Sequence, residues 1–298
     1  MKFKITHKTT YEYLETVPVC HNQVHLTPRN SPWQECTYHR VNVKPSPAGI
    51  SRQTDYFGNA MTFFSILQAH RRLSVTAISK VSVAERPPRE AGESPDWQSV
   101  SESLRSDPSH KGLEAYQFSF ESPLIPYLAE LRDYARPSFP AGRPIAAGLA
   151  DLTARIHRDF TYDPKATTVS TPTAEVFEKK RGVCQDLAHV QIGCLRSLGL
   201  AARYVSGYLR TVPPPGKPRL VGADASHAWV SLFAGPWGWI DADPTNDVLP
   251  GSDHITLAWG RDYADVAPIR GMFVGGGHQS LSVSVDVLPL DEPQPAIS

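Results

Sequence analysis

A cysteine that starts a helical pattern constrains this chain more than any other feature. Gly182 and Val183 precede Cys184, and apolar residues then recur at spacings of three and four. The apolar positions of this helix, which we expect to form one buried stripe, are Leu187, Val190, Cys194, Leu195 and Leu198. Gly199 is the kind of residue that commonly ends a helix. The pattern therefore predicts that Cys184 lies in the first turn of a helix.

A thiol in the first turn of a helix lies beside free backbone N–H groups and the positive end of the helix dipole. That environment favours the thiolate, which is the reactive form of cysteine. Gly182 would leave room for a substrate chain beside the sulfur. The alternative is that Cys184 is a small buried apolar residue, as we expect for Cys194 in the middle of the helix.

A predicted β-hairpin downstream carries a candidate base and a candidate orienting acid. Residues 226–233 alternate as a half-buried strand does, and residues 237–243 form a second strand after a turn. If the hairpin is centred on Gly235, His227 faces Asp243 closely enough for a hydrogen bond. A slip of one residue would separate the two side chains.

A cysteine, a histidine and an aspartate can together activate a thiol. His227 would take the proton from Cys184, and Asp243 would fix the tautomer and steady the imidazolium. Asp241 is a rival for the orienting acid, but in the same register it would face Trp229. The alternative is structural, because strand histidines and aspartates before proline often serve packing and turns.

Three segments resemble the three motif blocks of the bacterial transglutaminase-like superfamily: GVCQD (182–186), GADASHAW (222–229) and WIDADPTN (239–246). The resemblance covers roughly residues 150–250. It implies a Cys184, His227 and Asp243 triad on a papain-like α+β core. In that core the cysteine-bearing helix packs on an antiparallel sheet.

The amino-terminal part of the chain has a different pattern. Residues 1–84 contain short alternating strands separated by turn residues, as in a small antiparallel β-sandwich. The segments LTPR (26–29) and DYFGN (55–59) resemble the amino-terminal β domain of bacterial transglutaminase-like proteins. The sequence thus predicts a small β-sandwich domain before the catalytic core.

The domain boundaries follow from composition. We predict a loose linker over residues 85–112, a catalytic domain over 113–290 and a flexible tail over 291–298. Helices are expected over 122–136, 145–157 and 171–178. The proline-rich loop at 213–218 either rims the active cleft or is a simple surface connection.

Charge and cysteine content exclude several classes of partner. Thirty basic and thirty acidic residues cancel, so bulk charge predicts no nucleic-acid partner. The start of the chain lacks the apolar region of a secretion signal, and no apolar run could span a membrane. Four widely spaced cysteines suggest neither a disulfide framework nor a metal site. We predict a cytoplasmic protein with no cofactor, and the sequence does not indicate its oligomeric state.

A weak metal pattern occurs near the amino terminus. Cys20, His21 and His25 are potential ligands, but on a strand Cys20 points away from the two histidines. We therefore predict no metal site there. His189, five residues after the candidate nucleophile, is interpreted as a structural histidine.

The predicted chemistry is thiol-dependent acyl transfer through a thioester, with a peptide or protein as substrate. The resemblance favours a cysteine peptidase or amidase, in which water cleaves the thioester. It also implies two alternatives: a protein-glutamine gamma-glutamyltransferase that cross-links or deamidates, and a catalytically silent binding or scaffold protein. The Cys184 backbone N–H is one expected oxyanion donor. Further candidates for oxyanion or substrate contacts are Tyr162, Gln185 and Trp229.

Overall fold

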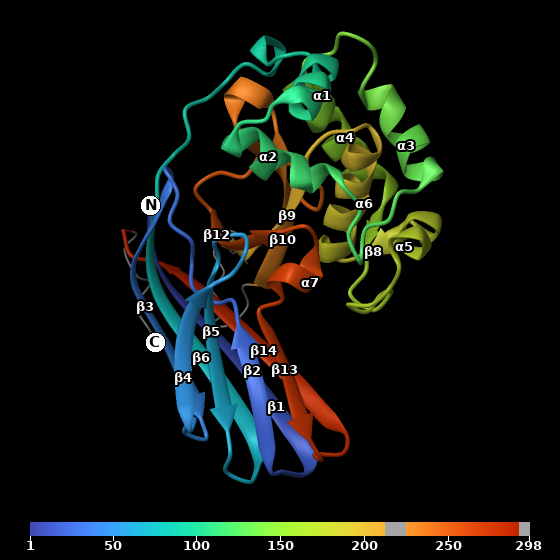
Figure 1. Cartoon of the computed structure of the whole chain (residues 1–298). Helices are drawn as coiled ribbons and strands as arrows, with labels where there is room; N and C mark the ends of the chain where they lie inside the picture. The colour runs from blue at the N-terminus through green and yellow to red at the C-terminus, as the bar shows by residue number, and fades with distance from the viewer. Residues whose placement is uncertain (212–224, 292–298) are drawn as a thin grey trace, which may run out of the picture.

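A computed structural model describes residues 1–211 and 225–291 of the 298-residue chain. It shows a β-sandwich that packs against an α+β unit, with most of the helices gathered at the end of the molecule away from the long strands (Figure 1). The predicted loop at 213–218 lies outside the described residues, as does the tail from 292 onward.

Two four-stranded antiparallel sheets form the sandwich. The strand orders are β14-β1-β6-β3 and β13-β2-β5-β4. The strands are β1 (Lys2–Val17), β2 (Val19–Val24), β3 (Gln34–Lys44), β4 (Gly49–Thr54), β5 (Ala60–Ile66), β6 (His70–Val83), β13 (Ile269–Val274) and β14 (Gln279–Pro289). Alternate residues such as Phe3, Ile5, Leu73 and Val75 are buried between the sheets, as the period of a strand requires. The predicted β-sandwich is therefore present.

The last two strands of the sandwich come from the far end of the chain. β13 pairs with β2 and β14 pairs with β1, so that Ile269 lies opposite Val24 and Leu281 opposite Tyr11. The predicted boundary placed 113–290 in one catalytic domain, and this must be corrected. The local alternation of residues 281–287 identifies a strand, but it carries no information about a partner so distant in sequence.

The second unit is built on an antiparallel sheet in the order β11-β10-β9-β12. Its strands are β9 (Ala202–Leu209), β10 (Ala225–Phe233), β11 (Trp239–Ala242) and β12 (His254–Gly260). The helices are α1 (Trp97–Ser106), α2 (His110–Tyr116), α3 (Ala129–Ala135), α4 (Ile145–Asp159), α5 (Thr173–Lys179), α6 (Cys184–Ser197) and α7 (Tyr263–Val266). Two short strands, β7 (Thr161–Tyr162) and β8 (Arg181–Gly182), pair in parallel before α6.

Helix α6 lies at the centre of this unit, in contact with β9, β10, α3, α4 and α5. Every residue from Gln185 to Arg196 is buried, so the prediction of a single buried stripe is wrong. Buried hydrogen bonds make this possible. Arg196 donates to the carbonyl oxygens of Phe118, Ala202 and Arg261, which satisfies a guanidinium in the interior. Gly199 ends the helix with a positive φ of 78°, as predicted.

Residues 85–112 do not form a wholly irregular linker. They include α1, whose Asp96 cap accepts a hydrogen bond from the Ser99 backbone, and the start of α2. The Trp97 indole donates to the Pro140 carbonyl oxygen at 2.9 Å, so this segment is fixed to the α+β unit. α3 begins only at Ala129, because Pro126 lies in the range where we expected a longer helix.

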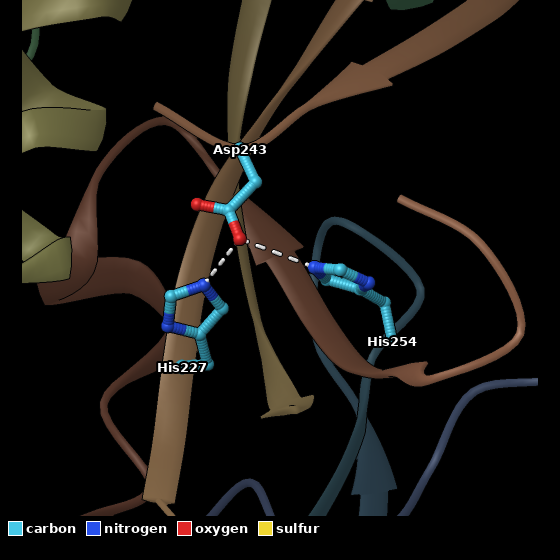
Figure 2. Close-up of side chains that lie close together, drawn as sticks. All are labelled: His227, Asp243 and His254. Atoms are coloured by element: carbon cyan, nitrogen blue, oxygen red, sulfur yellow. Dashed lines mark hydrogen bonds and ion pairs between the residues drawn. The ribbon is translucent and has the colours of Figure 1, made fainter. Parts of the chain in front are cut away.

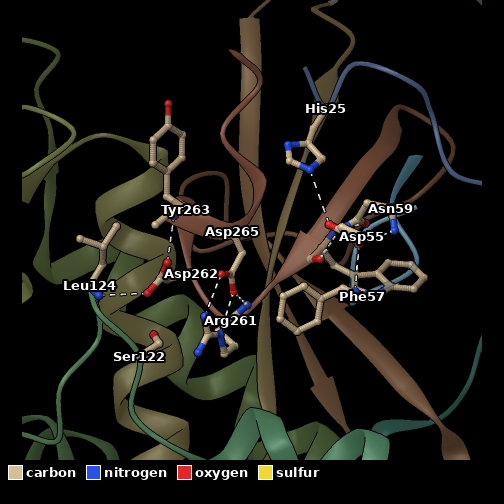
Figure 3. Close-up of polar contacts among 12 residues, drawn as sticks. His25, Asp55, Phe57, Asn59, Ser122, Leu124, Arg261, Asp262, Tyr263 and Asp265 are labelled. Atoms are coloured by element: carbon tan, nitrogen blue, oxygen red, sulfur yellow. Dashed lines mark hydrogen bonds and ion pairs between the residues drawn. The ribbon is translucent and has the colours of Figure 1, made fainter. Parts of the chain in front are cut away.

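Two side-chain amides of the sandwich hold the edge strand β12. We call Gln34 and Asn59 the amide clamp. Gln34 both donates to and accepts from the backbone of Thr256, and Asn59 does the same with the backbone of Trp259. Asp55 in turn accepts a hydrogen bond from the Asn59 amide at 2.7 Å (Figure 3). The clamp thus closes an edge that would otherwise leave strand hydrogen bonds unmade.

Candidate active site

The turn before Cys184 is held by a buried carboxylate. Asp186 accepts hydrogen bonds from the Val183 backbone N–H at 2.8 Å and from the Thr167 hydroxyl at 2.6 Å. Burial raises the pKa of Asp186, although both hydrogen bonds act in the opposite direction. A Cβ on Gly182 would lie 2.6 Å from a carboxylate oxygen of Asp186. The glycine therefore makes room for Asp186, and our expectation that it makes room for substrate is corrected.

The hairpin of β10 and β11 has a different register from the predicted one. Phe233 lies opposite Trp239 and Val230 opposite Ala242, which moves the pairing by two residues. The reason is a longer turn, which contains the 3₁₀ helix Gly235–Trp237. A shift of two residues keeps each side chain on the same face of the sheet, whereas a shift of one would not.

Asp241 and Asp243, the two candidates for the orienting acid, have different surroundings in the structure. Asp241 lies opposite Ser231, rather than Trp229, and its carboxylate binds the Arg86 guanidinium at 2.7 Å. Asp243 follows the last residue of β11 and is fully buried. Its side chain therefore reaches His227 from the end of the strand and not from a directly opposed position.

His227 and Asp243 form a short hydrogen bond, 2.7 Å between Nε2 and Oδ2 (Figure 2). The other carboxylate oxygen accepts the backbone N–H of Thr245 at 2.9 Å. These bonds fix the orientation of the carboxylate and of the imidazole ring. Because Nε2 is engaged by Asp243, Nδ1 is the ring nitrogen left to exchange a proton with another group.

A second histidine binds the same carboxylate oxygen. His254 Nε2 lies 3.1 Å from Oδ2 of Asp243, on the side away from His227 (Figure 2). The Asn246 amide also donates to this oxygen, at 2.7 Å. Sequence analysis missed both residues. Asn246 lies three positions after Asp243 and could have been proposed from that spacing, but His254 belongs to another strand and had no local signal.

Burial and hydrogen bonding shift the pKa values of this cluster in opposite directions. Burial alone would lower the pKa of His227, but the hydrogen bond to Asp243 and the interaction with the Cys184 thiol raise it to about 10. Burial alone would raise the pKa of Asp243, but His227, His254 and Asn246 hold it well below its usual range. The arrangement thus favours an imidazolium beside a carboxylate.

Three groups at this position are also of the kind that binds metal ions. One ligand-type atom each from His227, Asp243 and His254 lies within 4.8 Å of the others. Both imidazoles make direct hydrogen bonds to one oxygen of the carboxylate, at 2.7 and 3.1 Å. A metal ion would have to replace these two bonds, so the geometry favours a hydrogen-bonded cluster over a metal centre.

A cleft of about 260 Å³ brings the candidate nucleophile and base together. Cys184 and His227 both line it, and further surface comes from β1, β9, β14, Tyr263 of α7 and the segment around Ile269. The cleft residues are His7, Thr9, Tyr11, Val183, Cys184, Gln185, Tyr204, Ser206, Ser226, His227, Ala228, Tyr263, Pro268, Ile269, Leu281 and Val283. A thiol and an imidazole are thus accessible from one cavity.

The three further candidates for oxyanion or substrate contacts differ in their exposure and contacts. Tyr162 is 53% exposed, and Cys184 is close enough to contribute, after burial, to raising its pKa. Gln185 lines the cleft, but its amide donates to the Val169 carbonyl oxygen at 3.3 Å. Trp229 is 1% exposed and does not line the cleft, so its prediction as a substrate contact is wrong.

The Trp229 ring instead packs against the rings of His227 and His254. Its ring lies 5.3 Å from that of His254 and 6.2 Å from that of His227. A Cβ on Gly207 would lie 2.4 Å from the Trp229 ring, so the glycine permits this packing.

The remaining histidine and cysteine predictions concern structure. His189 is buried and accepts a hydrogen bond from the Tyr263 backbone, and burial lowers its pKa to about 4. Cys20, His21 and His25 do not converge: they contact His70, Ser65 and Asp55, respectively.

Comparison with known proteins identifies two regions of the chain. Residues 3–82 match the bacterial transglutaminase-like N-terminal region, and residues 138–244 match the transglutaminase-like superfamily. The first match falls on the sandwich strands β1–β6, and the second contains Cys184, His227 and Asp243.

Relatives with similar length are found in mycobacteria. An uncharacterized protein of Mycobacterium tuberculosis is 42% identical over 295 residues, which are 97% of this chain and 93% of the relative. One from Mycobacterium leprae is 33% identical over 294 residues, 97% of this chain and 99% of the relative. A protein-glutamine gamma-glutamyltransferase of Pseudomonas aeruginosa is 31% identical over 128 residues, 37% of this chain and 19% of that protein.

A solved structure shares the whole fold. The crystal structure of a candidate cysteine protease from Cytophaga hutchinsonii covers 100% of this chain, and this chain covers 94% of it, with a TM-score of 0.77 and 20% identity. None of the helices in the described residues is long and apolar enough to cross a membrane. The two matched regions and the mycobacterial relatives show that this chain belongs to the transglutaminase-like superfamily, in its bacterial form with the characteristic N-terminal region.

Proposed function

We propose that this protein is a thiol-dependent acyl-transfer enzyme that hydrolyses peptide or amide bonds. Cys184 would be the nucleophile, His227 the general base and acid, and Asp243 the orienting carboxylate. One observation carries the proposal: His227 binds Asp243 at 2.7 Å while it lines the same cleft as Cys184. This is the arrangement that thiol activation requires.

The Cys184 thiol first gives its proton to Nδ1 of His227, which forms the thiolate–imidazolium pair that the raised pKa of His227 favours. The sulfur attacks the carbonyl carbon of the substrate amide and forms a tetrahedral intermediate with a negative oxygen. The carbon–nitrogen bond then breaks as the imidazolium gives its proton to the leaving amine. Water attacks the resulting thioester and loses a proton to His227, which releases a carboxylic acid and restores the thiol.

The negative oxygen needs hydrogen-bond donors. The backbone N–H of Cys184 is placed at the first residue of α6, where N–H groups have no partner within the helix. Tyr162 is the side-chain candidate for a second donor, because it is half exposed and near Cys184. The Gln185 amide is directed to Val169, which makes it the weaker candidate.

Two relatives bear on the choice of acceptor. The Cytophaga hutchinsonii protein with the same fold is a candidate cysteine protease, which supports hydrolysis. The Pseudomonas aeruginosa relative is a protein-glutamine gamma-glutamyltransferase, so transfer to an amine, or deamidation, is the second candidate function. Both reactions would use the same thioester, and they differ only in whether water or an amine attacks it.

Thiol labelling tests the triad. We expect iodoacetamide to label Cys184 rapidly at neutral pH, and His227→Ala to slow that labelling by about 100-fold or more. Cys36 serves as an internal reference, because it is half-buried and burial raises the pKa of its thiol. Equal rates for Cys184 in the wild type and in His227→Ala would contradict an activated pair.

Product analysis tests the reaction class. The protein is incubated with a peptide library with and without an excess of a primary amine, and the products are identified by mass. Cleaved peptides that do not depend on the amine indicate hydrolysis, whereas amine adducts on glutamine indicate transfer. If the wild type gives the same products as Cys184→Ala, the chain is a silent scaffold and the proposal fails.

A further inference from the structure

The sandwich supplies one side of the cleft that contains the proposed nucleophile. On β1 the cleft residues are His7, Thr9 and Tyr11, which alternate and so share one face of the strand. On β14 they are Leu281 and Val283, which pair with Tyr11 and Thr9. β14 also contacts β10, the strand that carries the proposed base. The two terminal strands of the described fold therefore reach the catalytic cavity.

The apolar residues that β14 contributes to the cleft are exposed, whereas the next apolar residues along the same face of the strand are buried. Val285 and Val287 continue the same face of β14 into the sandwich core and are 1% and 0% exposed. Leu281 and Val283 are 57% and 52% exposed. The apolar alternation thus extends beyond the core of the sandwich and into the cleft. Contact between these side chains and a bound apolar group would remove apolar surface from water, which favours binding of such a group.

The described cleft residues carry no carboxylate, ammonium or guanidinium group. His7 and Tyr11 are the titratable groups on the sandwich side, and burial raises the pKa of Tyr11. Both ring nitrogens of His7 are engaged, with the hydroxyls of Tyr208 at 2.9 Å and Thr9 at 3.1 Å. Burial lowers the pKa of His7 to about 4, so the ring is neutral at pH 7. Beside the sandwich residues of the cleft, a charged side chain would meet no described side chain of opposite charge and would lose hydration.

We propose that Tyr11, Leu281 and Val283 form a specificity pocket for an uncharged, apolar side chain next to the scissile amide of a peptide substrate. This inference rests on the proposed function, because it assigns the peptide to the same cleft. It gives the N-terminal β domain a direct part in substrate selection, since β1 provides Tyr11 and holds β14 in place.

Peptide binding tests the pocket without requiring turnover. Four labelled peptides of one sequence, with leucine, glycine, lysine or glutamate at the central position, are titrated with the Cys184→Ala variant. We expect the leucine peptide to bind at least about tenfold more tightly than the lysine and glutamate peptides. Equal binding of all four peptides would overturn the pocket, whatever the wild type does with them.

A charge placed on the surface identifies the residues responsible. In the Cys184→Ala background, Val283→Glu should weaken binding of the leucine peptide about tenfold and strengthen binding of the lysine peptide. Ser282→Glu is the matched control, because it adds the same charge one position away on the opposite, exposed face of β14. If both substitutions change the peptide preference equally, long-range charge and not the pocket is responsible, and the inference fails.

The same peptides separate this inference from the proposed function. If the wild type cleaves the leucine peptide and Val283→Glu shifts cleavage toward the lysine peptide, both proposals hold. If binding shows the expected preference but the wild type forms no product or thioester, the pocket stands and the enzymatic proposal fails. Unchanged iodoacetamide labelling of Cys184 in the Ser282→Glu control shows that a charge added to β14 outside the cleft leaves the catalytic groups intact.

Discussion

The Gln34 side chain forms two hydrogen bonds with the backbone of Thr256, each 2.8 Å long. Gln34 belongs to the sandwich, and Thr256 belongs to β12 of the α+β unit. The amide therefore pairs with an edge strand as another strand would. His254, which binds Asp243, lies two residues earlier on β12, so the sandwich helps to position the candidate active site.

Gln34→Leu should destabilise the protein by about 1–3 kcal/mol, because the Thr256 N–H would lose its acceptor in a partly buried position. The Thr256 carbonyl oxygen keeps a bond from the Arg29 backbone, which limits the loss. Urea unfolding measures the change. Gln53→Leu is the control, since Gln53 is exposed on β4. A similar loss in both variants would show that the clamp adds nothing specific.

His254→Ala should slow the labelling of Cys184 by about tenfold, because Asp243 loses one of the donors that orient it. His254→Gln should recover part of the rate, since its amide nitrogen can occupy the place of Nε2. The pH profile of labelling should also change, because the pKa of Asp243 would rise when His254 no longer donates to it. A rate and profile identical to the wild type would exclude a positioning role.

Asp243→Asn should remove about 3–5 kcal/mol of stability near pH 6, where both members of the pair are charged. The raised pKa of His227 gives a contribution that is complete below its ordinary value of 6.5 and is lost as pH rises through about 10. The lowered pKa of Asp243 gives a contribution that is present above 3.8 and is lost as pH falls through the folded value.

The difference in melting temperature between wild type and Asp243→Asn should therefore be greatest between about pH 4 and 6.5. Asp133→Asn is the matched control, because Asp133 pairs with Arg136 where both side chains are 61% exposed, and it should cost less than about 1 kcal/mol. A difference that does not vary with pH would contradict the charged pair.

Gly182→Ala should destabilise the protein by about 1–3 kcal/mol, because its Cβ would meet the Asp186 carboxylate. The same substitution should slow labelling of Cys184, since Asp186 holds the Val183 backbone just before it. At Gly49 a Cβ meets nothing within 4 Å, so Gly49→Ala is expected to leave stability within about 0.5 kcal/mol. Calorimetry of the two variants distinguishes this packing constraint from a general cost of replacing glycine.

Sequence alone predicted that His227 and Asp243 meet, but it did not predict the register of the strands that carry them. His227 and Asp243 meet as expected, although the predicted centre of the hairpin was wrong. The error was of two residues, and an even shift preserves the face on which each side chain lies. The 3₁₀ turn that causes it, Gly235–Trp237, cannot be distinguished from a tighter turn by its glycine and proline alone.

The features that escaped prediction depend on contacts between distant parts of the chain. β14 pairs with β1, and His254 reaches Asp243 from a separate strand, so neither has a local pattern that names its partner. The full burial of α6 was missed because Gln191 and Arg196 interrupt its apolar pattern. Both make hydrogen bonds inside the protein: the Gln191 amide nitrogen donates to the Thr153 hydroxyl, and the Arg196 guanidinium donates to backbone carbonyl oxygens.

The pairing of β1 with β14 also sets an order for the assembly of the cleft. Synthesis proceeds from the amino terminus, so a ribosome makes Tyr11 before Cys184 and His227, and it makes Leu281 and Val283 after them. Pairings between such distant residues form slowly, because a long loop must close first. A nascent chain consequently carries its thiol and imidazole for a period during which the groove beside them is still open on one side.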